Sequence, residues 1–262
     1  MFPIAHCWLL ESIIPAPLPA HRLGAAWPDM LLESPITHTD SHKRGRELLD
    51  FARARVVAGA PEAGEFAAFV AGVLTHGSEP HGFDWYSDEA YDNPDPKGRG
   101  YAFQRAAPLA AATAAACHLP AEMGLWKAHN IIEMACDHRL YAADRALAER
   151  FLAALGDGAL VERIATHLAE FYRKPAAQLA TSIGNFATWW APPESPLVQA
   201  RIYAHQVAVK HHVSDVDVPA LAALIERADA LVAPDAAAFA ARCVASVGDL
   251  LRELAVDATL WV

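Results

Sequence analysis

Apolar residues recur along most of this chain at steps of three and four, which is the period of an α-helix. Between residues 61 and 76, the side chains of Phe66, Phe69, Val70 and Val73 follow this spacing. A stripe of this kind buries one face of a helix against a core. We therefore expect an amphipathic helix over 61–76.

The same pattern, with prolines near several starts, predicts helices over most of the remaining chain. The segment from about 121 to 154 has one early glycine, Gly124, and no internal proline. We expect it to form one long helix that ends at Gly156 and Gly158. Further helices are expected over 43–58, 101–118, 159–173, 175–188, 196–213, 218–232 and 235–256.

The predicted class is all-α, because no alternation of apolar and polar residues persists long enough to indicate a strand. No internal repeat, and no linker rich in glycine or serine, divides the chain. We therefore expect a single all-α domain over 1–262. Its candidate chemistry falls within about 1–140, and the helices of about 141–262 would support that half.

Two stretches, 15–42 and 77–100, lack helical periodicity, and the second combines acidic with aromatic residues. A structureless loop of that length inside a helical protein is uncommon and is more often functional than not. We expect 77–100 to form a lid or a wall of a site. The aromatic side chains that would either line a pocket or pack this loop onto the helices are Phe83, Trp85, Tyr86 and Tyr91.

Composition narrows the possible functions. A hydrophobic share of 54% with 20% charged residues excludes intrinsic disorder. The 21 Lys and Arg against 31 Asp and Glu, a net charge of −10, argue against an extended nucleic-acid surface or binding to anionic membranes. No CxxC pair occurs, so we expect free buried thiols rather than a thiolate zinc site. The four cysteines are Cys7, Cys117, Cys136 and Cys243.

The N-terminal segment is a poor signal peptide, because it lacks a basic start and its apolar run is broken by His6, Glu11 and prolines. The uncharged Ala-rich stretch between Arg105 and Glu122 is too short to span a bilayer and contains His118. We expect a cytoplasmic protein without a transmembrane segment.

The 13 histidines are the unusual feature of the composition, because histidine is the commonest metal ligand. On the expected long helix, His129, Glu133 and Asp137 follow one another at steps of four, so they share one face. An imidazole and a carboxylate one turn apart can bind one cation such as Zn²⁺. The alternative is a polar stripe that simply faces solvent.

Other candidate ligands lie on separate segments. His76 closes the 61–76 helix and precedes a loop that carries Glu79, His81 and Asp84. A histidine at a helix end can also merely complement the helix dipole. Three more candidates come earlier, each with a plain alternative as a helix cap or core residue: His6, Asp29 and the pair His38 and His42.

The remaining histidines suggest no chemistry. Four of them lie on amphipathic stretches without carboxylates placed to join them, so we expect structural or surface roles: His167, His205, His211 and His212. No role is assigned to His21, His118 or His138.

The order of these segments resembles the zinc-dependent phospholipase C / P1 nuclease superfamily. An early His is followed by Gly-x-x-x-Pro-Asp, a His-rich stretch, Phe-x-x-Gly-x-x-x-His and finally His-x3-Glu-x3-Asp on a long helix. The resemblance covers roughly residues 4–140. It implies a bundle of helices that holds two or three zinc ions, or other divalent cations, with a metal-activated water that cleaves phosphate esters.

The resemblance implies a set of ligands. His6 is similar to the family's early His, Asp29 to the Pro-Asp ligand, and His42, or less closely His38, to the next His. His76 resembles the His that ends the Phe-x-x-Gly helix, and His129 with Glu133 resembles the final pair.

This chain departs from the family in three ways. The family has Asp four residues after the fourth-motif His, where this chain has Pro80; Asp84 is the expected substitute, ahead of Glu79 or His81. A further His ligand is not evident soon afterwards. The export signal that leaves a mature N-terminal amine as a ligand in secreted members is also missing.

The implied mechanism places two or more cations about 3.5–4 Å apart, where they clamp phosphate oxygens and lower the pKa of a bridging water to about 7. Asp84 would orient that water, and Asp137 is a second candidate catalytic carboxylate, either as a ligand or by orienting an imidazole. The expected partner is a small phosphate ester or a phospholipid head group. The alternative is a non-catalytic or single-metal helical binding protein that retains the scaffold.

Overall fold

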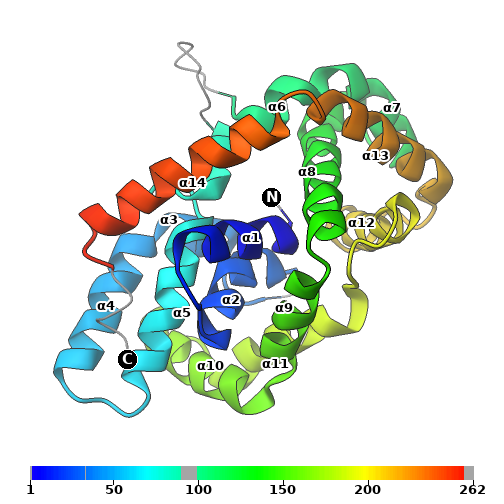
Figure 1. The fold of residues 1–262 in the computed structure, drawn as a ribbon. Helices are drawn as coiled ribbons and strands as arrows, with labels where there is room; N and C mark the ends of the chain where they lie inside the picture. The colour runs from blue at the N-terminus through cyan, green and yellow to red at the C-terminus, as the bar shows by residue number, and fades with distance from the viewer. Residues whose placement is uncertain (1, 33, 90–98, 257–262) are drawn as a thin grey trace.

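The structure, a computed structural model, describes residues 2–32, 34–89 and 99–256, and every regular element within them is helical (Figure 1). The predicted all-α class is therefore confirmed for this part of the chain. The first half contains α1 (Pro3–Ile13), α2 (Pro19–Ala26), η1 (Trp27–Met30), α3 (His38–Lys43), α4 (Gly45–Val57), α5 (Ala63–His76), η2 (Trp85–Glu89), α6 (Tyr101–Ala106), η3 (Ala107–Leu109) and α7 (Ala110–Ala116). The second half contains η4 (Ala121–Met123), α8 (Gly124–Ala143), α9 (Ala146–Gly156), α10 (Gly158–Tyr172), α11 (Ala176–Trp189), α12 (Pro196–His211), α13 (Val218–Val232) and α14 (Ala236–Glu253).

The helix α1 lies between two apolar cores and contributes to both (Figure 1). Ile4 and Leu10 pack with residues of α2, α5 and α9–α11, whereas Ala5 and Leu9 pack with residues of α6, α8 and α12–α14. A helix that is apolar on all sides is stable only when it is buried. The N-terminal segment is therefore the central element of the fold.

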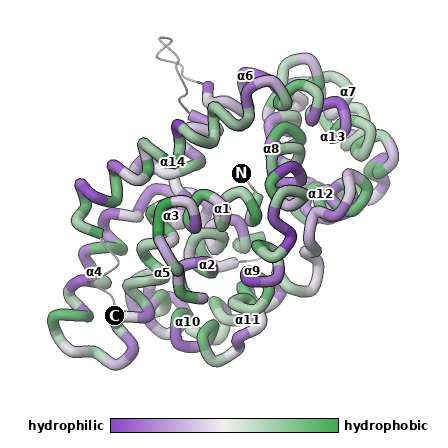
Figure 2. The backbone as a smooth tube through the Cα atoms, viewed as in Figure 1, coloured by the Kyte–Doolittle hydropathy of each residue, from purple (hydrophilic) through white to green (hydrophobic). Residues whose placement is uncertain are grey.

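The outer helices show the one-sided pattern that the sequence predicts. In α14 the buried positions Phe239, Cys243, Val247 and Leu251 recur every four residues. Figure 2 shows the corresponding alternation of hydrophobic and hydrophilic positions along this helix. Phe239, Cys243 and Val247 of this stripe pack in the core with α6, α8, α12 and α13, whereas Leu251 packs in the core with α2, α5 and α9–α11.

Two of the expected helices are interrupted. The predicted helix over 101–118 passes through a 3₁₀ turn at Ala107–Leu109, where Pro108 lacks the N–H that a continuous α-helix needs. The predicted single helix over 121–154 is wrong, because Asp144 is extended, with φ −143° and ψ 91°, and separates α8 from α9.

The break at Asp144 coincides with the passage of the chain from one core to the other. Ile131 and Ile132 of α8 belong to the core with α12–α14, whereas Leu147 and Phe151 of α9 belong to the core with α2 and α5. One straight helix could not bury both faces in these two places, so tertiary packing overrides the local helical pattern.

The stretch 15–42, expected to be irregular, contains α2, η1 and α3. Two glycines let α2 and α5 touch: a Cβ on Gly24 would lie 1.9 Å from the carbonyl oxygen of Phe69, and a Cβ on Gly72 2.1 Å from that of His21. All four cysteines are buried and unpaired, as expected.

Among the described helices, none is by itself both long and apolar enough to cross a membrane. The helices α13 and α14 are long and apolar enough only when they are counted as one segment, a criterion of length and composition alone. The two helices meet at a bend of 75°.

Candidate metal centre

His6 reaches the centre of the molecule through α1, and Asp137 on α8 holds the start of that helix. The Oδ1 atom of Asp137 accepts a hydrogen bond from the backbone N–H of Ala5 at 2.7 Å. This N–H lies in the first turn of α1, where no carbonyl one full turn earlier is available, and it also lies 3.1 Å from the carbonyl oxygen of Phe2. The imidazole of His6 follows directly and is completely buried.

His76 ends α5 beside the close crossing of α5 with α2. Its Nδ1 lies 2.6 Å from the carbonyl oxygen of Ala25. Because a carbonyl only accepts hydrogen bonds, Nδ1 carries a hydrogen, and Nε2 is the ring atom that faces the carboxylates of Asp84 and Asp29. The His76 ring stacks on that of His6 with centroids 3.5 Å apart. A hydrogen bond of this kind is the usual way to orient a metal-binding imidazole.

His42 is oriented in the same manner on the short helix α3. Thr37 begins this helix, since its hydroxyl accepts a hydrogen bond from the backbone N–H of Asp40. The Nδ1 atom of His42 lies 2.9 Å from the carbonyl oxygen of His38, which leaves Nε2 to face Asp84. The carbonyl of His42 in turn accepts hydrogen bonds from the backbone N–H groups of Ser78 and Glu79, so α3 is tied to the segment that carries Asp84.

The carboxylate of Asp84 lies among three imidazoles. Its oxygens are 3.3 Å from Nε2 of His6, 3.3 Å from Nε2 of His42 and 3.1 Å from Nε2 of His76. The oxygens of Asp29 are 3.7 Å from Nε2 of His6 and 3.9 Å from Nε2 of His76. We refer to these five residues as the N-terminal donor cluster.

These spacings fit a bound cation. Zinc–nitrogen and zinc–oxygen bonds are about 2.0–2.1 Å, so two ligands at a tetrahedral angle are about 3.4 Å apart. The five nitrogen–oxygen distances, from 3.1 to 3.9 Å, bracket this value. Two sets within the cluster have their ligand atoms all within 4.8 Å of one another: His6, Asp29 and His76, and His42, His76 and Asp84.

The electrostatics of the N-terminal donor cluster also favour a cation. Burial, reinforced by His76, lowers the pKa of His6 to about 3, so this imidazole is neutral at neutral pH. Burial, with a contribution from Asp84, raises the pKa of Asp29. Burial would raise the pKa of Asp84 as well, but the neighbouring imidazoles of His76 and His6 lower it well below its usual range. The carboxylates of Asp84 and Asp29 raise the pKa of His76 despite its burial. A cation would displace the protons that His76 and Asp29 retain, because neutral imidazole and ionised carboxylate are the forms that bind metal ions.

A second group, the α8 donor cluster, consists of Asp88, His129 and Glu133. His129 and Glu133 are one turn apart on α8, and Asp88 approaches from η2, a π-helical turn. Burial lowers the pKa of His129 to about 4. Burial and the negative charge of Glu133 raise the pKa of Asp88 well above its usual range. Two carboxylates that face each other out of water are stable together only with a proton or a cation between them.

Hydrogen bonds from two neighbours hold Glu133 in place. Ser87 donates its hydroxyl hydrogen to Oε1 at 2.7 Å, and the amide of Asn130 donates to Oε2 at 3.3 Å. Despite burial, which raises it, the pKa of Glu133 is lowered to about 2 because of His129 and a hydrogen bond from Asp88. Glu133 is therefore an ionised, oriented carboxylate.

Several donor atoms of both clusters are buried without a hydrogen-bond partner among the described residues. They are Nδ1 and Nε2 of His6, Oδ2 of Asp29, Nε2 of His76, Oδ1 of Asp88 and Nδ1 of His129. Buried polar atoms normally find partners, so several unsatisfied atoms in one place indicate an ion or water. The residues present thus fit a divalent cation.

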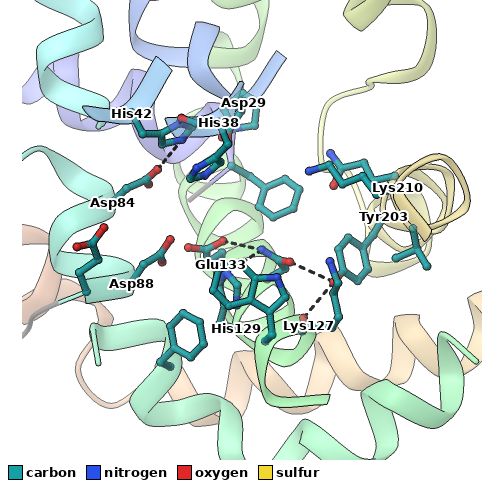
Figure 3. Close-up of a pocket in the computed structure, with 18 of the residues that line it drawn as sticks. Asp29, His38, His42, Asp84, Asp88, Lys127, His129, Glu133, Tyr203 and Lys210 are labelled. Atoms are coloured by element: carbon teal, nitrogen blue, oxygen red, sulfur yellow. Dashed lines mark hydrogen bonds and ion pairs between the residues drawn. The ribbon is translucent and has the colours of Figure 1, made fainter. Parts of the chain in front are cut away.

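The two clusters border one pocket of about 430 Å³ (Figure 3). Asp29, His42 and Asp84 reach it from one cluster, and all of the α8 donor cluster lines it. Lysine and tyrosine side chains line the other side, and the aromatic walls come from elements far apart in the sequence. The aromatic and basic lining residues are Phe2, Phe103, Trp126, Phe186, Trp190, Tyr203, Arg99, Lys127 and Lys210.

The structure thus brings seven of the eight predicted ligands together; the eighth, His38, behaves differently. It lines the pocket and stacks on His42 at 3.7 Å, but joins none of the three donor sets. Asp137 also lies outside the three sets and the pocket lining. Its hydrogen bond to α1 makes it a positioning residue, which does not support the expectation of direct catalysis.

None of the described aromatic residues of the 77–100 stretch lines the main pocket. Phe83 is buried and contacts His6 edge to face, and Trp85 stacks on His81 at 3.8 Å. Tyr86 lines a separate surface pocket, and Tyr91 falls outside the described residues. The aromatic lining of the main pocket comes instead from Phe103, Trp126 and others that sequence patterns do not single out.

Sequence reasoning also missed Ser87, Asp88, Asn130, Lys127 and Lys210. The acidic character of 77–100 was a signal for Asp88, whereas nothing in the spacing of the lysines relates one to the other. Comparisons of this chain with protein-family models, with curated proteins and with solved structures found no match.

Proposed function

We propose that this protein is a metal-dependent hydrolase of phosphate esters, with zinc as the expected metal. The observation that carries the proposal is the position of Asp84 among Nε2 atoms of His6, His42 and His76 at 3.1–3.3 Å. A second donor cluster on the same pocket adds to it, because hydrolysis by paired cations needs two neighbouring sites. The order of the sequence motifs resembles that of the phospholipase C / P1 nuclease superfamily, which also supports a metal-dependent phosphate-ester hydrolase.

The N-terminal donor cluster would hold one or two cations and the α8 donor cluster a further one. When bound, such cations lower the pKa of water and neutralise phosphate charge. The protein contributes the orientation of the ligands. The carbonyls of Ala25 and His38 hold the Nδ1 hydrogens of His76 and His42, and Ser87 holds Glu133. The aromatic walls of the pocket limit the access of water to a bound ester.

Metal content tests the proposal first. Protein supplemented with zinc and then freed of excess metal should contain two or three equivalents. A fully folded preparation that contains none would overturn the proposal. Hydrolysis of bis-p-nitrophenyl phosphate, abolished by a chelator and restored by zinc, then separates an enzyme from a binding protein. Metal without hydrolysis would favour the non-catalytic alternative.

A further inference from the structure

The pocket has two walls of opposite charge. Carboxylates of Asp84, Asp88 and Glu133 lie on one side, and the ammonium groups of Lys127 and Lys210 enter from the other (Figure 3). Lys127 belongs to the first turns of α8, whereas Lys210 ends α12. Two lysines from distant parts of the chain therefore share one cavity.

Neither ammonium group has a partner within the described part of the chain. Among the described residues, no carboxylate forms an ion pair with Lys127 or Lys210, and no hydrogen bond joins either side chain to another group. Lys43, by contrast, contacts both Glu79 and Glu89 within 4 Å. The exposed Lys210 has water in place of a protein partner, whereas the buried Lys127 has neither.

The lack of a partner matters most for Lys127, which is only 6% exposed. Lysine is almost never buried to this extent unless it is paired, because a charge out of water costs several kcal/mol. The neighbouring Lys210 adds repulsion rather than relief. An anion bound in the pocket would offset both the burial of the Lys127 charge and the repulsion between the two lysines.

The backbone around the lysines is ordered by Tyr203. Its hydroxyl lies 3.1 Å from the carbonyl oxygen of Lys127 and 3.1 Å from Oδ1 of Asn130. These contacts join α12 to α8, and Asn130 also donates to Glu133. One network therefore fixes the lysine wall relative to the α8 donor cluster, as expected for two subsites that bind one ligand.

We propose that Lys127 and Lys210 form an anion subsite, so that the preferred substrate is a phosphate ester whose second substituent carries its own negative charge. Such a substituent is a carboxylate or a further phosphate, held by the lysines while the scissile phosphate lies at the donor clusters. The subsite disfavours cationic substituents such as choline. This inference rests on the proposed hydrolase function and names its substrate class.

Three p-nitrophenyl phosphodiesters that differ only in the other ester group test the preference: 2-carboxyethyl, propyl and choline. With the zinc-supplemented protein, we expect the KM of the carboxyethyl ester to be about tenfold lower than that of the propyl ester, because charge-assisted hydrogen bonds are the strong ones. The choline ester should have the highest KM. Equal values for the three esters would overturn the inference.

Lys127→Met, which retains the apolar stem, should bring the KM ratio of propyl to carboxyethyl ester close to 1. Lys210→Met, at an exposed site with little risk to folding, should lower the same ratio in the same direction. Lys174→Met is the control, because Lys174 is exposed outside the pocket and the ratio should stay unchanged. If Lys127→Met raises both KM values equally, the lysines bind the scissile phosphate and the inference is wrong.

A binding measurement keeps the inference separate from catalysis. Calorimetry with 2-carboxyethylphosphonate and propylphosphonate, neither of which can be hydrolysed as an ester, should show about tenfold tighter binding of the former, lost in Lys127→Met. If this preference is found without hydrolysis of any ester, the subsite stands and the hydrolase proposal fails. If esters are hydrolysed but the carboxylate lowers neither the KM of the ester nor the dissociation constant of the phosphonate, the hydrolase proposal stands and the subsite fails.

Discussion

The N-terminal donor cluster and the α8 donor cluster are built in opposite ways. The first takes its ligands from five elements: His6 from α1, Asp29 from η1, His42 from α3, His76 from α5, and Asp84 from the segment that follows. The second takes His129 and Glu133 from adjacent turns of one helix and adds Asp88 from η2.

They also differ in chemistry. The N-terminal donor cluster is rich in imidazoles, two of which are oriented by backbone carbonyls, whereas the α8 donor cluster has two carboxylates that face each other. Backbone carbonyls orient His42 and His76, whereas the side chains of Ser87 and Asn130 orient Glu133. We therefore expect tighter metal binding in the first cluster and easier metal exchange in the second.

The largest effect is expected from His76→Ala, because His76 belongs to both metal-binding sets of the N-terminal donor cluster. The variant should lose the metal of that cluster and at least about 100-fold in phosphodiester hydrolysis. Metal analysis of the purified variant and initial rates with bis-p-nitrophenyl phosphate measure the two effects.

His167→Ala is the matched control for this substitution. His167 is also a buried histidine, 4% exposed, and stacks on Phe66 away from both clusters. Its removal creates a comparable cavity but should leave the metal content unchanged. Equal metal loss in the two variants would show that His76 acts through stability alone.

A smaller and more selective effect is expected from Glu133→Gln. The substitution retains the shape of the side chain but removes the charge that a cation needs, so about one metal equivalent should be lost from the α8 donor cluster. The metal of the N-terminal donor cluster should remain, because Glu133 belongs to none of its sets. Loss of all metal at once would mean that the two clusters form one inseparable site.

Asp137→Asn tests the packing that holds His6. Burial raises the pKa of Asp137 from 3.8 to about 8, so the folded protein keeps a proton that the unfolded chain releases. The free energy of unfolding of the metal-free protein should thus fall between about pH 4 and pH 8, by up to about 1.4 kcal/mol per pH unit from this group. Asparagine still accepts the hydrogen bond from Ala5 but does not ionise.

Urea denaturation of the metal-free wild type and variant at several pH values measures this difference. Below about pH 4 Asp137 is protonated in both the folded and the unfolded wild type, so it no longer makes stability depend on pH. Between about pH 4 and pH 8 the free energy of unfolding of the variant should rise relative to that of the wild type. If the free energy of unfolding changes equally with pH in the two proteins, Asp137 is ionised in the folded state. Its environment would then be more polar than its burial indicates.

The smallest effect is expected from Ser87→Ala, which removes the hydrogen bond to Oε1 of Glu133. Affinity for the metal of the α8 donor cluster should fall about tenfold, and that of the N-terminal donor cluster should not change. Competition with a chelator measures both. Ser182→Ala is the control, because the hydroxyl of this buried serine donates to the carbonyl of Leu179 in its own helix, away from both donor clusters.

Local patterns in the sequence were sufficient where one face of a helix decides its position. The stripe of α14 predicted that helix within a few residues, and the four-residue spacing of His129 and Glu133 predicted their side-by-side placement. The same patterns predicted the helix α5, but all of its residues from Phe66 to His76 are buried, so the expected single buried face is wrong there. They failed at Asp144, where no glycine or proline marks the end of α8 and the break serves two separate cores.

The chain by itself therefore determined the helical class, most helix boundaries and the types of ligand available, because these depend on periodicity and residue chemistry. Only the tertiary structure decided that Asp84 lies among His6, His42 and His76, that Asp88 joins Glu133, and that Asp137 holds α1. It also placed Lys127 and Lys210 on one wall of the same pocket. Contacts between residues far apart in sequence depend on how helices pack, and local spacing carries no information about them.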